Sequence, residues 1–195
     1  MALQCADSET AYEKLLNAAR ILFYNHGIGG TGIDAIVKRA GVAKKSLYNN
    51  FASKDELVAA YLRVRHEEWL SLYEKRCQAT TTPRERVMAV FKAYEDHAEY
   101  AYEHGFRGCG LLNAAAELPA GAPGRRAVRE HKEEVEAILV SHLTELMGGD
   151  TENARSVAKH FAFLLEGSIS RAGLEGNSHC VAQASMMAEQ MMEAC

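Results

Sequence analysis

The sequence carries repeated helix-start signals, and these constrain the fold more than any other feature. A Ser or Thr followed three residues later by Asp or Glu has the spacing of a capping box, in which each side chain hydrogen-bonds the other residue's backbone N–H. This spacing occurs at Thr31–Asp34, Ser53–Glu56 and Thr82–Glu85, and Asp7 and Ser8 offer a further N-cap. Apolar residues recur at helical spacing behind each signal, and no segment alternates as a half-buried strand does. These patterns predict an all-α chain.

Glycines and prolines predict where the helices end. The first helix should end near His26–Gly27. A break around Gly105–Gly110 precedes a short helix over Leu111–Leu118, and Pro119–Gly124 forms a linker. Gly148–Gly149 should end the helix that follows. Counted in this way, the chain holds about nine helices.

The charge of the chain is unevenly distributed. The formal net charge is −4, but residues 1–55 hold seven Lys and Arg against five Asp and Glu, whereas the remaining 140 residues hold 15 against 21. With 195 residues, 48% of them apolar, the chain can form one or two small domains with a proper core. The asymmetry favours a small DNA-reading head on an acidic body, whose charge disfavours indiscriminate binding.

The cysteines and histidines do not form a metal-binding pattern. The five cysteines are odd in number and include no Cys-x-x-Cys pair, which argues against a disulfide framework or a zinc site. His97, His104 and His131, taken with Cys109, lack the i, i+3 or i, i+4 spacing of a helical ligand pair. We therefore expect no metal and no cofactor.

Hydropathy argues against export and against a membrane span. No apolar run approaches about 18 residues, the minimum for a spanning helix. The N-terminus has no basic segment followed by an apolar one, as a secretory signal would. Together with the cysteine usage, these features predict a cytoplasmic protein without a membrane partner.

The stretch Gly41–Phe51 has the composition of a DNA-reading helix. Val42, Leu47 and Phe51 can share one helical face, while the residues between them carry ammonium, hydroxyl and amide groups. Alone, the stretch could equally be an ordinary polar surface helix. Because a short helix ending in a glycine turn precedes it, the arrangement predicts a helix-turn-helix, whose second helix enters the DNA major groove.

Residues 14–62 resemble the N-terminal domain of the TetR family of one-component transcriptional regulators. The resemblance is carried by Lys14–Phe23, His26–Gly27, Ile36–Val42, Ser46–Tyr48 and Phe51–Leu57. It implies a three-helix DNA-binding domain over residues 1–53, which contains the helix-turn-helix. It also implies a helical body over residues 54–195 that binds an inducer and forms a homodimer through its last two helices.

The resemblance also implies roles for individual residues of the head. Positions used near base edges are matched by Lys44, Lys45, Tyr48 and Asn49, and positions used for the phosphate backbone by Thr31, Ser46, Asn50 and Lys54. The sequence departs from the usual pattern at Ala43, where Ser is frequent, at Lys45, where Gly is common, and at Asn49–Asn50, which replace a frequent His-Tyr pair. These departures predict an operator that differs from those of relatives.

An inducer pocket should be mostly apolar with a few convergent polar groups. The candidates in the body are Trp69, Tyr73, Phe91, Tyr94, His97, Phe106, Cys109, Asn113, His131 and Phe163. Any one of the aromatic residues can instead be plain core, and His131 can be a hydrogen-bonded core histidine.

Cys109 supports an alternative, a regulator that senses electrophiles or oxidants through its thiol. It precedes a predicted helix, whose N-terminus stabilises a thiolate, and Arg107 is close in sequence. The other interpretation is a small buried cysteine that packs in the pocket wall.

The last two predicted helices combine small and large apolar residues, as a close helix–helix interface requires. The expected dimer contacts are Phe161, Leu164, Leu165, Ser168, Ile169, Ala172, Val181, Ala184, Met187 and Met191. A dimer formed there would present two recognition helices to adjacent major grooves, and its two-fold symmetry implies a palindromic operator.

Taken together, these patterns predict a homodimeric DNA-binding regulator, a repressor that a small-molecule inducer releases from its operator. No nucleophile–base pair, phosphate loop or metal spacing is present in the sequence, so we expect no enzymatic activity. The alternative function is that of a helical enzyme or a small-molecule binding protein. Salt-dependent DNA binding would distinguish a regulator from this alternative.

Overall fold

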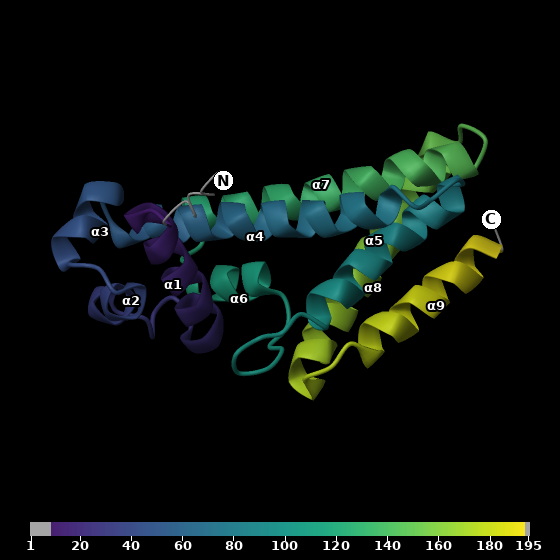
Figure 1. Ribbon diagram of the computed structural model, residues 1–195. Helices are drawn as coiled ribbons and strands as arrows, with labels where there is room; N and C mark the ends of the chain where they lie inside the picture. Colours follow the sequence, from purple (N-terminus) through teal and green to yellow (C-terminus); the bar gives the residue numbers. More distant parts are fainter. Residues whose placement is uncertain (1–8, 194–195) are drawn as a thin grey trace, which may run out of the picture.

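The computed structural model describes residues 9–193, and within this range the chain forms nine α-helices and no strand (Figure 1). The all-α prediction is therefore confirmed for the described residues. The helices are α1 (Ala11–His26), α2 (Ile33–Ala40), α3 (Lys44–Asn50), α4 (Lys54–Cys77), α5 (Pro83–Ala98), α6 (Gly110–Glu117), α7 (Pro123–Leu146), α8 (Thr151–Glu175) and α9 (His179–Glu193).

Three short helices form a head at one end of an elongated molecule. In Figure 1, α1, α2 and α3 cluster at the left, and α4 leads out of this cluster along the whole body beside α7. Ile36 of α2, Leu47 of α3 and the α1 residues Leu15 and Ala19 are all fully buried, and α1 packs against both α2 and α3. Because α4 starts at Lys54 and continues as one helix for 24 residues, head and body share a rigid element.

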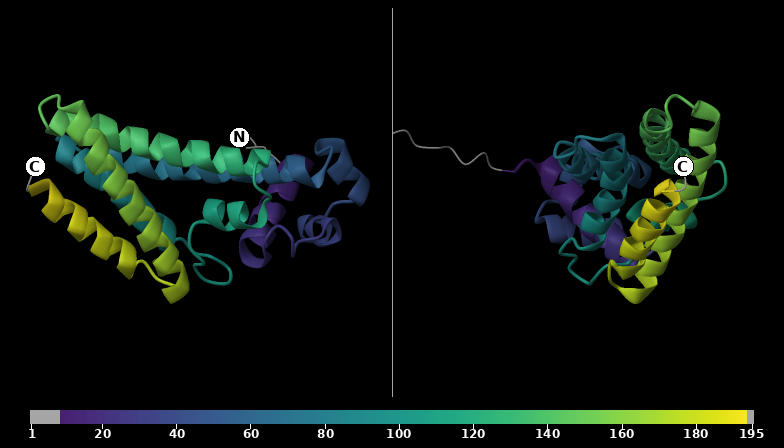
Figure 2. Two further views of the ribbon diagram at one scale, coloured as in Figure 1. Left: turned by 180° about the vertical axis from the view of Figure 1, so that it is seen from behind. Right: turned by 90° about the vertical axis from the view of Figure 1, so that its right-hand side faces the viewer.

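The body is a bundle built around α4, α5, α7 and α8, with α9 packed on α5 and α8. Figure 2 shows α8 and α9 side by side from behind, on the part of the body away from the head. The core includes Phe91 of α5 and Phe161 of α8, whose rings meet edge to face at 5.7 Å between centroids. No helix in the described range is long and apolar enough to cross a membrane.

The predicted helix starts are confirmed in part. Thr82 and Glu85 form the reciprocal capping box of α5, and the Asp150 side chain accepts the Asn153 N–H at the start of α8. At α4 the Ser53 hydroxyl accepts the Glu56 N–H, but the Glu56 carboxylate takes the N–H of Ala52 instead.

The helix caps predicted for the head differ from those in the structure or lie outside the described residues. The Thr31–Asp34 box is wrong, because Gly32 is the N-cap of α2 and no side chain caps it. Asp7 and Ser8 lie outside the described residues. The first helix starts with a capping box that the sequence reading missed, between Thr10 and Glu13.

The capping box of α5 makes a pH-dependent contribution to stability. The Glu85 carboxylate accepts the N–H groups of Thr81 and Thr82 at 2.7 and 2.9 Å, and these bonds lower its pKa from 4.5 to about 2. A folded-state pKa below the unfolded one stabilises above the unfolded pKa, and this stability is lost as pH falls from about 4.5 toward 2. We expect Glu85→Gln to lower the free energy of unfolding in urea at pH 6, and to lower it less at pH 3, where part of the Glu85 contribution is already lost. An equal deficit at both pH values would contradict this origin.

Candidate DNA-binding surface and internal site

The turn between α2 and α3 aims the recognition helix outward. Gly41 has φ 65°, the left-handed conformation that glycine adopts without strain, and the Val42 N–H reaches back to the Val37 carbonyl at 3.2 Å. Leu47 and Phe51 are buried, and the ring of Tyr12 stacks on Phe51 at 4.9 Å between centroids. The predicted apolar face is confirmed for Leu47 and Phe51, whereas Val42 lies before α3 and is half-buried against the same core. This face fixes which side of α3 faces solvent.

The outward face of α3 carries four of the predicted DNA-contacting residues. Lys45, Tyr48 and Asn49 are exposed, with Tyr48 52% accessible. Lys44 is also exposed, and its Nζ lies 2.8 Å from the Asp34 carboxylate of α2. That hydrogen bond raises the pKa of Lys44, so the residue stays cationic. The face thus offers ammonium, phenol and amide groups without a bulky apolar obstruction.

Two of the side chains predicted to contact phosphate are already hydrogen-bonded within the head. The Asn50 side-chain amide donates to the Ser46 carbonyl at 2.7 Å, and Lys54 Nζ donates to the Ile28 carbonyl at 2.6 Å. Ser46, Asn50 and Lys54 are all half-buried. A phosphate contact by Asn50 or Lys54 would share or replace these bonds within the head.

Thr31 does not fit the phosphate role. Its side chain is buried, and its hydroxyl lies 2.7 Å from the Gly27 carbonyl and 3.1 Å from the Leu22 carbonyl, at the end of α1. The prediction is corrected because a buried hydroxyl with two carbonyl partners cannot reach the DNA backbone. Thr31 instead closes the turn between α1 and α2.

Thr31→Val tests this structural role because valine keeps the shape and removes the hydroxyl. The carbonyls of Leu22 and Gly27 lose a buried donor, and we expect a loss of about 1–3 kcal/mol in the free energy of unfolding. Chemical denaturation followed by circular dichroism measures it. Thr31→Ser, which keeps the hydroxyl, should lose less. A Val variant as stable as wild type would contradict the assignment.

The head is fastened to the body by side chains from the segment around α6. The Glu117 carboxylate, at the end of α6, accepts the N–H groups of Ile28 and Gly29 at 2.9 and 2.7 Å. The Arg107 guanidinium donates to the carbonyls of Tyr24 and Asn25, at 2.7 and 2.5 Å. No sequence pattern predicted these contacts, which join residues more than 80 positions apart.

A cluster of aromatic and basic side chains forms an internal site between α4, α5, α6 and α7. The ring of Trp69 lies 5.4 Å from Tyr94 and 5.5 Å from His131 between centroids. The cluster surrounds a cavity of about 10 Å³, the room of roughly one water molecule. Its lining consists of Arg65, Trp69, Tyr94, His97, Cys109, Gly110, Leu111 and His131. Five of the ten predicted pocket residues therefore meet here.

The other five predicted pocket residues do not line this cavity. Phe91 belongs to the bundle core, and Phe106 packs near Tyr102. Tyr73 stacks on Trp69 but hydrogen-bonds His142 at 2.6 Å. These three are nearby packing residues.

The predictions that Asn113 and Phe163 line the inducer pocket are wrong. Asn113 is exposed, and its amide donates to the Arg107 carbonyl at 2.9 Å. Phe163 is 62% accessible because the opposite side of α8, with Phe161 and Leu165, faces the core. Neither residue can line an internal pocket in this arrangement.

The sequence reading missed Arg65, which is almost fully buried. Its guanidinium contacts His97 Nε2 at 2.7 Å, Tyr102 Oη at 3.1 Å and Glu68 at 2.9 Å. Burial, followed by the nearby Arg65 charge, lowers the pKa of His97 to about 3, so His97 is neutral and accepts from Arg65. One signal could have found it, since Tyr61, Arg65 and Trp69 share one stripe of α4 at four-residue spacing.

Cys109 lacks the surroundings expected of a reactive thiol. It is the N-cap residue of α6, is buried and forms no disulfide. Arg107, which the sequence reading placed beside it, extends its guanidinium to the head instead. A reactive cysteine needs partial exposure, so the burial of Cys109 favours packing over sensing.

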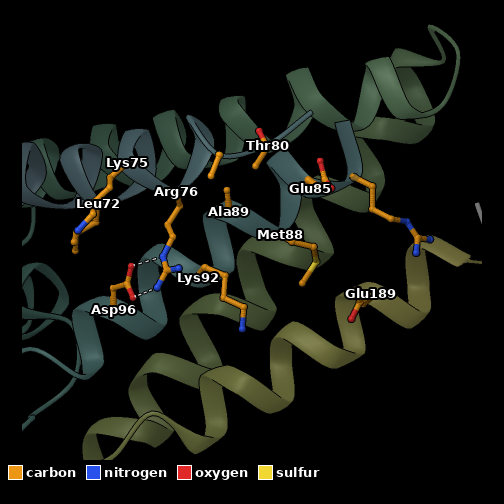
Figure 3. Close-up of a pocket in the computed structure, with 12 residues that line it drawn as sticks. Leu72, Lys75, Arg76, Thr80, Glu85, Met88, Ala89, Lys92, Asp96 and Glu189 are labelled. Carbon is orange, nitrogen blue, oxygen red and sulfur yellow. Dashed lines mark hydrogen bonds and ion pairs between the residues drawn. The ribbon is translucent and has the colours of Figure 1, made fainter. Parts of the chain in front are cut away.

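A groove of about 680 Å³ lies elsewhere on the body. Figure 3 shows its walls, formed by the end of α4, by α5 and by Glu189 of α9, with Arg76 paired to Asp96. None of the predicted pocket residues lines it. The groove is open to solvent and mixes cationic and anionic side chains, unlike the enclosed aromatic site.

Most of the predicted dimer contacts are buried inside the protomer. This correction applies to Phe161, Leu165, Ile169, Ala172, Val181 and Ala184, which form the α8–α9 contribution to the bundle core. Leu164 and Ser168 are half-buried, whereas Met187 and Met191 are exposed. The spacing of apolar residues predicts which stripe of each helix is buried. It does not predict whether the same protomer or its partner covers that stripe.

Comparisons with known proteins agree with the arrangement of head and body. The profile described as "Bacterial regulatory proteins, tetR family" matches residues 15–61. The HTH-type transcriptional activator FasR of Mycolicibacterium smegmatis is 37% identical over 87 residues, covering 45% of this chain and 40% of FasR. The HTH-type transcriptional regulator LmrA of Bacillus subtilis is 29% identical over 160 residues, covering 80% of this chain and 83% of LmrA. The chain thus aligns with less than half the length of FasR.

Similarity among solved structures extends over the body. SCO4454, a TetR-family transcriptional regulator from Streptomyces coelicolor, has a TM-score of 0.86 and 26% identity, and the match covers 94% of this chain and 95% of that one. A TetR regulator from Streptomyces avermitilis matches with a TM-score of 0.73 and 29% identity, covering 92% of this chain and 98% of that one. The likeness therefore includes both the head and the helical body.

Proposed function

We propose that this chain, which belongs to the TetR family of bacterial regulatory proteins, controls transcription by binding operator DNA through α3. The observation that carries the proposal is the two-sided character of α3. Leu47 is buried and Phe51 anchors the following turn, while Lys45, Tyr48 and Asn49 project into solvent. A helix of this kind can enter the major groove without disturbing the core of the head.

Operator binding is proposed to require a homodimer formed by α8 and α9. The support is the exposed apolar surface of these helices, which includes Phe163, Leu174, Met186 and Met187. Exposed large apolar side chains on two neighbouring helices are typical of a surface that a second protein covers. A two-fold dimer places one α3 in each of two major grooves about one helical turn apart, and its operator is palindromic.

The body is proposed to bind a small-molecule inducer that releases the DNA, so that the protein acts as a cytoplasmic repressor. The internal site supports this role, because it joins aromatic walls to a few convergent polar groups. Two side-chain contacts connect this site to the head. Arg65 lies over the ring of Tyr24, and Tyr24 donates to the Gly108 carbonyl at 3.1 Å.

Selection from a pool of random DNA duplexes tests the DNA-binding function. The proposal predicts enrichment of a palindrome whose affinity falls steeply with salt, as phosphate contacts require. Analytical ultracentrifugation of the complex should give two chains per duplex. If no duplex is enriched and binding shows no salt dependence, the proposal is wrong, and a helical binding protein or enzyme becomes the better reading.

Two neighbouring asparagines allow a matched test of base reading. Asn49 is exposed and unbonded in the described hydrogen-bond network, so Asn49→Ala should cost about 1–3 kcal/mol at the selected duplex and relax preference at one base pair. Asn50→Ala is the control, because its amide is held by the Ser46 carbonyl. It should weaken binding to all sequences alike. Fluorescence anisotropy with single-base duplex variants measures both, and the reverse outcome would contradict the assignment.

A further inference from the structure

Two buried N–H groups beside the internal cavity have no hydrogen-bond partner. They are Nε of Arg65 and Nε1 of Trp69, and both residues line the same cavity of about 10 Å³. Leaving a buried donor unpaired costs about 1–3 kcal/mol, and more when the group is charged. Two such donors at one cavity indicate that the site is incomplete without an acceptor.

The charges around the cavity specify what kind of acceptor fits. Arg65 lines it directly, and Lys132 Nζ lies 3.1 Å from the hydroxyl of Tyr94, another lining residue. No Asp or Glu is among the lining side chains of this described cavity. Burial, as the main cause, lowers the pKa of His131 to about 3, so His131 adds no charge. Glu68 pairs with Arg65 at 2.9 Å but is shared with Arg20, so the two arginines and Lys132 keep the surroundings cationic. A water-poor site of this charge with free N–H donors favours an anionic oxygen acceptor.

An outer groove between α4 and α7 leads to the cavity. Its volume is about 360 Å³, and its lining shares two residues with the cavity, Leu111 and His131. His131 Nδ1 lies 2.9 Å from His66 Nδ1, so this contact belongs to the wall that the groove and the cavity share. A rotation of the His131 ring would join the two spaces, and their combined size is that of a small-ligand pocket.

The walls of the outer groove restrict the rest of the ligand. Ala59, Leu62 and Ala127 provide an apolar surface, whereas Arg63, Glu130 and Glu134 give the groove a net negative charge. An apolar tail is accommodated there, but a second carboxylate at its far end is repelled.

We propose that the inducer is an organic monocarboxylate whose tail lies in the α4–α7 groove and whose carboxylate accepts hydrogen bonds from Arg65 Nε and Trp69 Nε1. The assignment rests on the proposed function, since it identifies the chemistry of the inducer. Binding moves His131 and Leu111 aside, and Leu111 belongs to the first turn of α6. The same helix holds the head through Glu117, so the carboxylate acts on the DNA-reading end.

The chain offers a direct probe, because Trp69 is its single tryptophan. Its indole N–H gives one signal in a proton–nitrogen correlation spectrum, and the signal moves downfield when the group donates a hydrogen bond. Octanoate should shift this signal and release the selected duplex, whereas octanamide and octanedioate should require at least about tenfold higher concentration. Equal responses to the three compounds, or an unshifted indole signal with octanoate, would overturn the carboxylate site.

Variants separate this inference from the proposed function. Trp69→Phe keeps a ring and removes the N–H donor, and it should bind the selected duplex normally but need about tenfold more octanoate for release. Tyr73→Phe removes a hydroxyl from the ring stacked on Trp69 but outside the cavity, and should respond as wild type does. Unchanged octanoate sensitivity of Trp69→Phe would refute the inference. Failure of wild-type protein to bind any duplex would instead refute the proposed function.

Discussion

The position of the head depends on a small set of polar contacts with the segment around α6, and Glu117 makes two of them. Glu117 accepts the N–H groups of Ile28 and Gly29, in the turn that connects α1 to α2. The head is a small unit of three helices, so its contacts with the body contribute to its orientation. These contacts are the continuous α4, the Glu117 carboxylate, the Arg107 guanidinium and the Arg39–Glu103 ion pair.

Helix α6 connects the internal site to the head over a short distance. Its first residues, Gly110 and Leu111, line the cavity, and its last residue, Glu117, holds the head. Because α6 is one short rigid helix, a displacement at its start is transmitted to its end. Gly110 has a packing reason as well, since a Cβ there would lie 2.9 Å from Tyr61 Oη and 3.2 Å from Arg65 Nε. Because α6 packs this closely against α4, a small displacement of α6 changes the shape of the cavity between them.

The sequence was sufficient for the helices and for α3, because both depend on local rules. Capping residues, glycine stops and 3.6-residue periodicity act within one or two turns, and the apolar face through Leu47 follows from spacing alone. The predictions that were wrong concern residues whose role depends on tertiary contacts. Thr31 has capping-box spacing, yet its hydroxyl turns inward to the Gly27 carbonyl. Phe163 has the composition of a pocket residue but lies on the exposed side of α8. Contacts such as that of Glu117 with Ile28 join distant residues and leave no local pattern.

Because Glu117 joins the end of α6 to the α1–α2 turn, α6 and the head should open as one unit, and native-state hydrogen exchange tests this most directly. The amide groups of Ile28 and Gly29 report on the head contact, and the amide of Ala114 reports on α6. The opening free energies of these three amide groups should agree and fall together as urea is added. Fast exchange at Ile28 and Gly29, while Ala114 stays protected, would show that the Glu117 contact opens independently and would contradict the account.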